Sequence, residues 1–176
     1  ALPLNIANRI LSQRLKNVAK KEGSPFLSGS AYRDGWFLKS GVEWGEISLT
    51  PVSGGDSEWK ACIPIIEQEL RRAIEYGFAP FELEEQKANL LRSYQKAVDT
   101  ASTQKSQALA KQVVDSINSK SVVSSPEENL RIIEKGVETI TVEQLHDVFK
   151  SFWDTPDHTL VLYAKEAEAN AVEEMN

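Results

Sequence analysis

The spacing of apolar residues changes twice along the chain, and these changes limit the folds that it can adopt. From Leu4 to Val18 apolar residues recur every three or four positions, which is typical of a helix with one buried face. From Phe26 to Thr50 the spacing falls to two, which predicts strands, and from Asp56 onward the helical spacing returns. We therefore expect an α+β fold, with helices packed on one face of a largely antiparallel sheet.

The strand region contains one strong turn signal. Asp34-Gly35 suits a tight type I′ hairpin, because both central residues of that turn need positive φ. It predicts that Phe26–Arg33 pairs with Trp36–Leu38, and a further strand is expected at Val42–Leu49. Thr159–Ala164 reads as a last strand. So few strands leave the sheet incomplete, with an unpaired edge.

The remaining segments read as helices. One begins at Asp56 or Ser57 and ends at Gly77, and Pro64 should kink it or shorten its first turn. Phe81–Asn118 reads as one long helix, which the polar stretch 99–103 bends or interrupts. Two capping boxes then start short helices, the second of which ends near Trp153: Ser125-Pro126-Glu127-Glu128 and Thr141-Val142-Glu143-Gln144.

Size and charge narrow the class of protein. The chain has 176 residues, with 20 Lys+Arg against 26 Asp+Glu and a net charge of −6. We expect a single domain over residues 1–164, followed by an acidic tail at 165–176. The acidic balance argues against nucleic acid as a partner, since such binding depends on cations that neutralise phosphates. No apolar run approaches the roughly 18 residues of a membrane span, so no membrane partner is expected. The chain begins at Ala1 without a methionine, which suggests an excised piece.

The sequence offers little catalytic chemistry. A zinc hydrolase needs at least three protein ligands, and neither His146 nor His158 sits in a ligand-spaced motif, so both read as surface or half-buried histidines. Cys62 lies on the apolar stripe of a helix, where it reads as a core residue. Gly54-Gly55 lacks the Lys that would follow in a phosphate-binding loop. No residue is therefore assigned a catalytic, cofactor-binding or metal-binding role.

The positions of the charged clusters along the predicted helices can be explained by helix stability. The acidic clusters lie in first helical turns, where they complement the helix dipole; they are Glu82, Glu84, Glu85, Glu127 and Glu128. The basic clusters lie near helix C-terminal ends for the same reason; they are Lys16, Lys20, Lys21, Arg71 and Arg72. Two alternatives stay open. The lysines could meet an anionic partner, and one of the arginines could face a substrate.

Several segments resemble the insulinase/pitrilysin-type zinc peptidases, also called inverzincins. The run Trp59–Leu83 contains E-x-R-R-A-x-x-Y-G-F, formed by Glu69, Arg71, Arg72, Ala73, Tyr76, Gly77 and Phe78, and leads into Glu82-Leu83. Three further segments fit the same order, and the resemblance spans about Leu4 to Ala164: Asn8-Arg9-Ile10-Leu11 with Arg14-Leu15, Ser24-Pro25-Phe26 and Ile140-Thr141-Val142-Glu143-Gln144.

The resemblance implies a non-catalytic domain of a larger peptidase. Such proteins consist of two halves, each with two related α+β domains, and only the first domain carries H-x-x-E-H, which this chain lacks. Lys16 to Phe26 also lacks the Arg/Tyr pair that the later half uses for substrate, which favours the second domain of the first half. The implied cofactor is zinc in the parent protein, with none in this chain. The implied partners are the zinc domain, the other half and a peptide substrate.

Three readings follow from these observations. The chain could form part of the wall of the substrate chamber of a zinc metalloendopeptidase and support its zinc domain. The resemblance favours the bacterial periplasm over the cytoplasm as its compartment. The chain could instead be a catalytically inactive structural or interaction subunit of the same fold, because a fold does not fix a function. A third reading is a helical adaptor that docks through Phe81–Asn118. The family domain also has one or more strands before its first helix, where this chain begins. The resemblance therefore implies an open sheet edge, through which the chain is expected to self-associate or to pair with another strand.

Overall fold

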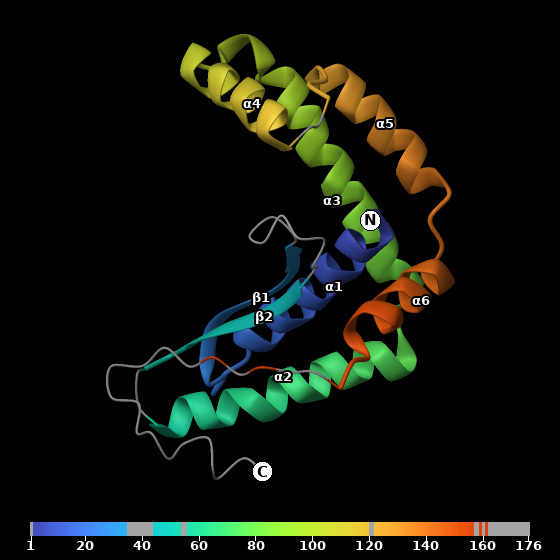
Figure 1. Ribbon diagram of the computed structural model, residues 1–176. Helices are drawn as coiled ribbons and strands as arrows, with labels where there is room; N and C mark the ends of the chain where they lie inside the picture. Colours follow the sequence, from blue (N-terminus) through green and yellow to red (C-terminus); the bar gives the residue numbers. More distant parts are fainter. Residues whose placement is uncertain are drawn as a thin grey trace. The chain divides into compact units, whose positions relative to one another are not determined.

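The computed structural model describes residues 2–34, 44–53, 56–119, 122–156, 159 and 161. In chain order the elements are α1 (Leu2–Ala19), β1 (Phe26–Asp34), β2 (Trp44–Pro51), α2 (Asp56–Tyr76), α3 (Pro80–Asp99), the 3₁₀ turn η1 (Ala101–Thr103), α4 (Ser106–Ser119), α5 (Pro126–Glu138) and α6 (Val142–Trp153) (Figure 1). The chain forms two compact units. The first contains Pro3–Phe78 and the chain from Glu143, and the second contains Ala79–Val142. The α+β class is confirmed, whereas a single domain over residues 1–164 stays a prediction.

The sheet of the first unit is an antiparallel pair of strands in the described residues. Arg33 lies opposite Gly45, and Asp34 lies opposite Trp44. The tight hairpin predicted at Asp34-Gly35 includes Gly35, which lies outside the described residues, so it stays a prediction. The predicted strand at Val42–Leu49 is confirmed as β2, whereas Trp36–Leu38 lies outside the described residues. Also outside the described residues are most of the predicted strand Thr159–Ala164 and all of the tail at 165–176.

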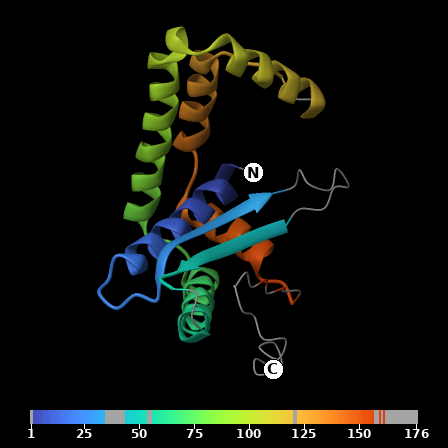
Figure 2. The same cartoon turned by 90° about the vertical axis from the view of Figure 1, so that its left-hand side faces the viewer.

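Helix α1 supplies more buried apolar side chains to the core of the first unit than any other described element. Its buried apolar face agrees with the predicted spacing, and consists of Leu4, Ile6, Ala7, Ile10, Leu11 and Leu15. The helix lies beside β1 in both views (Figures 1 and 2). A Cβ atom at Gly29 would come within 3.0 Å of the Leu15 Cβ, so the absence of a side chain there allows helix and strand to approach closely. Burial of each large apolar side chain stabilises the fold by about 1.5–3 kcal/mol.

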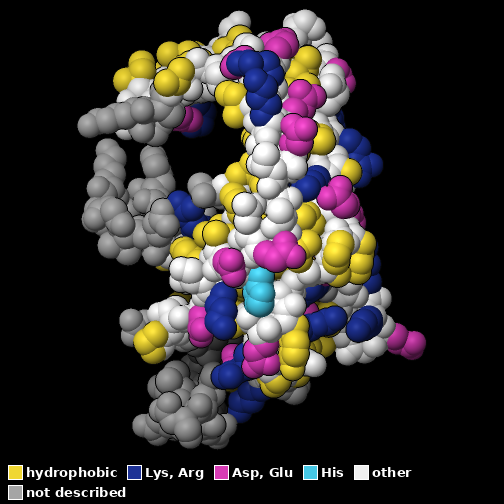
Figure 3. All heavy atoms as spheres, turned by 90° about the vertical axis from the view of Figure 1, so that its right-hand side faces the viewer, with side chains coloured by type: hydrophobic (Ala, Val, Ile, Leu, Met, Phe, Trp, Pro, Cys, Tyr) yellow, Lys and Arg dark blue, Asp and Glu magenta, His cyan; other side chains and the backbone are white. Residues whose placement is uncertain are grey.

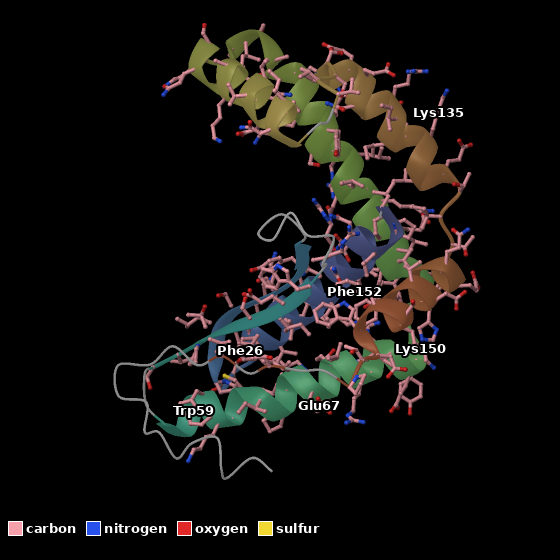
Figure 4. All side chains as sticks on the ribbon, viewed as in Figure 1. Phe26, Trp59, Glu67, Lys135, Lys150 and Phe152 are labelled. Atoms are coloured by element: carbon pink, nitrogen blue, oxygen red, sulfur yellow. The ribbon has the colours of Figure 1, made fainter. Side chains whose placement is uncertain are left out.

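Helix α2 runs alongside the sheet and continues through Pro64. The shortened first turn is therefore wrong, since the helix already begins at Asp56. Pro64 is exposed, so the carbonyl group that loses its hydrogen-bond donor lies on the side of the helix that water can reach. Trp59, Cys62, Leu70 and Ala73 are buried as the stripe predicts. Figure 4 shows Trp59 on this helix and Phe26 at the start of β1.

Helix α6 packs on the rest of the first unit through aromatic side chains. The Phe149 ring meets the Phe78 ring edge-on at 5.2 Å, and it lies 6.0 Å from the Trp153 ring. A Cβ atom at Gly45 would lie 2.6 Å from Trp153 and 2.7 Å from Phe152, which is labelled in Figure 4. Gly45 therefore lets α6 rest directly on β2, as Gly29 does for α1.

The second unit consists of helices. α3 and α5 lie side by side, and α4 turns away from α3 after η1, which confirms the predicted interruption at 99–103 (Figure 2). Leu83 and Leu90 of α3 are buried, as is Val137 of α5. The predicted helix starts are confirmed at Pro126 and Val142. The large apolar side chains of α4 that the structure describes are exposed: Leu109, Val113, Val114 and Ile117.

Candidate functional site

The residue types that carry catalysis are dispersed in the described residues. No group of three or more His, Cys, Asp or Glu side chains that could hold a metal ion lies among them. Cys62 is buried, and its thiol lies 3.8 Å from the Pro25 carbonyl oxygen, which confirms the core reading. His146 is half-buried, and Figure 3 shows a histidine side chain at the surface among acidic and basic ones. His158 lies outside the described residues.

His146 holds the end of helix α2. Its Nε2 atom lies 2.7 Å from the Ile74 carbonyl oxygen, within hydrogen-bond distance. The ring also covers Gly77, where an added Cβ atom would lie 2.9 Å from the His146 Cγ. Gly77 has a φ of 68°, in the left-handed region that glycine adopts at helix C-terminal ends. The half-buried histidine is therefore a structural residue, as its sequence context predicts.

Arg14 completes this helix end from α1. Its guanidinium donates a 3.0 Å hydrogen bond to the Gly77 carbonyl oxygen and lies 5.2 Å from the centre of the Phe78 ring. A cation at a helix C-terminus is favoured by the dipole, and stacking on an aromatic ring adds to the attraction. Gly77 and Phe78 of the signature segment thus have a structural explanation in the packing of α2, α1 and α6, whereas Tyr76 is exposed.

The arginine pair on α2 points outward and forms pairs within its own helix. Arg71 pairs with Glu67, and Arg72 lies 3.7 Å from Glu69. The hydrogen bond with the Glu67 carboxylate raises the pKa of Arg71 above its usual value. Glu69 is buried, and its Oε2 atom has no hydrogen-bond partner among the described residues. Sequence reasoning missed this burial, although Glu69 follows the buried Trp59 and Cys62 at helical spacing.

The face of the sheet that points away from α1 carries a ladder of polar pairs. The Ser28 hydroxyl donates to Thr50 at 3.1 Å, and the Ser30 and Ser48 hydroxyl oxygens lie 3.1 Å apart. The Tyr32 hydroxyl donates to Glu46 at 2.7 Å, while the ring of Tyr32 meets Trp44 edge-on. Alternation along the strands places these side chains on one face. On the described part of this face, the hydroxyl and carboxylate groups bind one another across the two strands.

Helix α1 binds the outer edge of β1 at Ala31. The Ser12 hydroxyl accepts a hydrogen bond from the Ala31 N–H at 2.8 Å and lies 3.1 Å from the Ala31 carbonyl oxygen. In an antiparallel pair the N–H and C=O of one residue point to the same side. Both Ala31 groups therefore point toward α1 and away from β2. Sequence reasoning missed Ser12, because nothing local distinguishes it from other polar residues of the helix.

Helix α4 displays apolar side chains at its surface. The exposed fraction reaches 46% for Leu109, 44% for Val113 and 70% for Ile117. These residues are four apart, so they lie along one side of the helix. A stripe of this kind is typical of a surface that is covered by another protein or domain.

Solved structures resemble this chain over nearly all of its length. A predicted insulinase family protease from Yersinia pestis superposes with a TM-score of 0.78 and 19% identity, over 99% of this chain. The periplasmic protease PqqL from Escherichia coli gives 0.71 and 18% over 86% of this chain. The first half of PqqL gives 0.72 and 17% over 87%. The chain has the fold of an insulinase-type protease domain. The resemblance read from the sequence is thereby confirmed at the level of the fold.

The chain spans only a part of each insulinase-type protein. It covers 16% of PqqL, 32% of the structure of its first half and 37% of the Yersinia protease. No protein-family model matches the sequence, and no curated protein is similar enough to be a relative. In the described part of the chain, every helix is too short or too polar to cross a membrane.

Proposed function

We propose that this chain is a non-catalytic domain of a larger zinc metalloendopeptidase. One observation carries the proposal: the insulinase-type fold matches 99% of this chain but only 37% of the Yersinia protease. The chain thus has the dimensions of one piece of such a protein. The absence of H-x-x-E-H from its sequence agrees with a supporting role.

The domain would form part of the wall of the substrate chamber. The zinc ion, held by another domain, would polarise the scissile carbonyl group and activate water. The described residues of this chain do not fit a metal site, since no suitable cluster of ligands lies among them. This chain would therefore contribute surfaces and no catalytic group. One surface is the polar outer face of the sheet. The other is the apolar stripe of α4, which suits contact with the parent protein's other domains.

The proposal also includes the position of this domain in the parent protein and the cellular compartment of that protein. The match to the first half of PqqL supports the first half of the parent protein. The lack of the Arg/Tyr pair between Lys16 and Phe26 supports the second domain of that half. The periplasmic location of PqqL supports the bacterial periplasm.

The parent protein tests the proposal. We expect the gene region upstream of residue 1, over roughly 200 residues, to encode an H-x-x-E-H helix. The full-length protein should bind one zinc ion per chain and cleave unfolded peptides, and a chelator should abolish cleavage. The matched control replaces the glutamate of that motif by glutamine, which should stop cleavage and keep the fold. A full-length protein without the motif and without zinc would refute the peptidase and favour an inactive structural subunit.

A further inference from the structure

The edge of β2 differs from the edge of β1. In the described residues the sheet has the order β1-β2, so β2 has a single neighbouring strand. Ala31 lies opposite Ile47, and its backbone groups bind Ser12 instead of β2. The pairs on either side, Ser30 with Ser48 and Tyr32 with Glu46, are therefore the hydrogen-bonded ones. It follows that the N–H and C=O groups of Ile47 point away from β1, to the outer edge of β2.

The same alternation applies along the strand. The outward groups belong to Gly45, Ile47 and Leu49, which stand opposite Arg33, Ala31 and Gly29. No hydrogen bond joins these outward groups to other elements in the described part of the chain. All three residues are half-buried. Outward groups that have no strand beside them among the described residues are a template for another strand.

We propose that β2 pairs with β2 of a second copy of this chain, antiparallel and centred on Ile47. In this register Ile47 faces the same residue of the second copy, and Gly45 faces Leu49. Three residue pairs then exchange about six backbone hydrogen bonds. A neighbouring register centred on Glu46 or on Ser48 aligns fewer of the outward groups. The proposal rests on the sheet alone and does not depend on the peptidase function.

Side chains on both faces fit this register. On the polar face Glu46 stands opposite Ser48 of the second copy, so no carboxylate faces another across the strands. On the other face the large Leu49 stands opposite Gly45, and the two isoleucines meet at the centre. The pairing is thus complementary in both charge and size. A register centred on Glu46 would instead place two carboxylates opposite each other, which is unfavourable.

The pairing ends at a dimer. It joins two sheets into one of four strands, whose outer edges are β1 of each copy. The edge of β1 is occupied at Ala31 by Ser12 of α1, so a third copy cannot add in the same way. The two-fold arrangement is closed, and fibres are not expected.

Two charge variants at one position test the register. Ser48 lies on the polar face, and its side chain contacts Ser30 in the monomer; S48E and S48K both remove that contact. S48E places two like-charged pairs across the new interface, and S48K places two opposite-charged pairs there. By sedimentation velocity over a range of concentrations we expect a monomer–dimer equilibrium. Its Kd should rise on the order of tenfold for S48E and should fall for S48K.

A cross-linking measurement defines the same register independently. A mixture of the E46C and S48C chains should form an oxidised heterodimer, because these positions face each other in a non-hydrogen-bonded pair. E46C alone should cross-link far less. A chain that stays monomeric at all concentrations overturns the proposal, as does assembly beyond the dimer. Equal Kd values for S48E and S48K, or cross-linking of E46C to itself at the same rate, overturn the register.

Discussion

The indole N–H of Trp153 donates a 2.9 Å hydrogen bond to the side-chain oxygen of Asn8, and both residues are buried. The bond joins α6 to α1 across 145 residues of sequence. It satisfies the polar end of a large aromatic side chain inside the core, where an unpaired N–H group would be costly. The first and last helices of the first unit are thus fixed to each other by a polar contact as well as by apolar burial.

Removal of the acceptor should destabilise the first unit. Asn8→Ala leaves the Trp153 N–H without its partner, and we expect the free energy of unfolding to fall by about 1–3 kcal/mol. Urea unfolding, followed by tryptophan fluorescence, measures this loss. Asn5→Ala is the matched control on the same helix, because Asn5 is exposed and its side chain accepts a hydrogen bond from exposed Arg9. Its effect should stay within about 0.5 kcal/mol. Equal losses would show that the buried bond contributes nothing.

Two glycines with positive φ separate backbone strain from steric contact. Gly23 has a φ of 75° with nothing within 4 Å of an added Cβ atom, whereas Gly77 has a φ of 68° with His146 at 2.9 Å. Gly23→Ala should therefore cost about 1–2 kcal/mol from backbone strain alone. Gly77→Ala should cost at least about 1 kcal/mol more, because the ring of His146 must move. Thermal unfolding of the two variants provides the comparison. Equal costs would mean that His146 does not support the end of α2.

The N-terminus of α5 links stability to pH. The Ser125 hydroxyl accepts a 3.2 Å hydrogen bond from the Glu128 N–H. The pKa of Glu127 lies below its usual 4.5, because its own backbone N–H and then the Ser125 side chain donate hydrogen bonds to it. A carboxyl group with a lowered pKa stabilises the fold above the pKa of the unfolded state, and this contribution is lost as the pH falls through the folded pKa.

Ser125→Ala should therefore act in two ways. Loss of the cap should cost about 1 kcal/mol at neutral pH, and the pKa of Glu127 should rise toward its usual value. The difference in stability between the two proteins should shrink as the pH falls below 4.5. NMR titration of the Glu127 carboxyl group and urea unfolding at two pH values measure both effects. Ser125→Thr keeps the hydroxyl group and should preserve both properties. An unchanged Glu127 pKa in the alanine variant would contradict the assignment.

Short sequence windows predict the helices and strands, whereas contacts between distant residues determine how these elements pair and pack. The capping residues of α5 and the buried face of α1 are encoded in short windows, so the sequence predicts them. The turn signal at Asp34-Gly35 does not indicate that β1 pairs with β2 at Trp44–Pro51, because that register joins segments that no single short window contains. The apolar stripe of α4 was recognised as helical, but its exposure depends on what lies against it. Helical period alone does not contain that information.

Some residues of the candidate site can likewise be predicted from the sequence, and others cannot. The core position of Cys62 and the half-buried position of His146 follow from their helical stripes, and both are confirmed. Ser12 could not be predicted, because its bonds to Ala31 join a helix to a strand 19 residues away. The Y-G-F segment resembles a family signature in the sequence. The roles of Gly77 and Phe78 at the end of α2 depend on the positions of Arg14 and His146, which the sequence does not give.

Gly29 provides the last prediction, which tests the packing of β1 on its neighbours. An added Cβ atom would lie 2.5 Å from the Leu49 Cδ2 and 3.0 Å from the Leu15 Cβ. Gly29→Ala should therefore destabilise the protein by about 1–3 kcal/mol. Leu49→Ala alone should also destabilise, since it removes a half-buried side chain. The double variant should lose less than the sum of the two, by about 1 kcal/mol, because the new methyl group occupies space that Leu49 vacates. Simple additivity in urea unfolding would show that Leu49 does not limit the space at Gly29, and would leave Leu15 of α1 as the neighbour that excludes a side chain there.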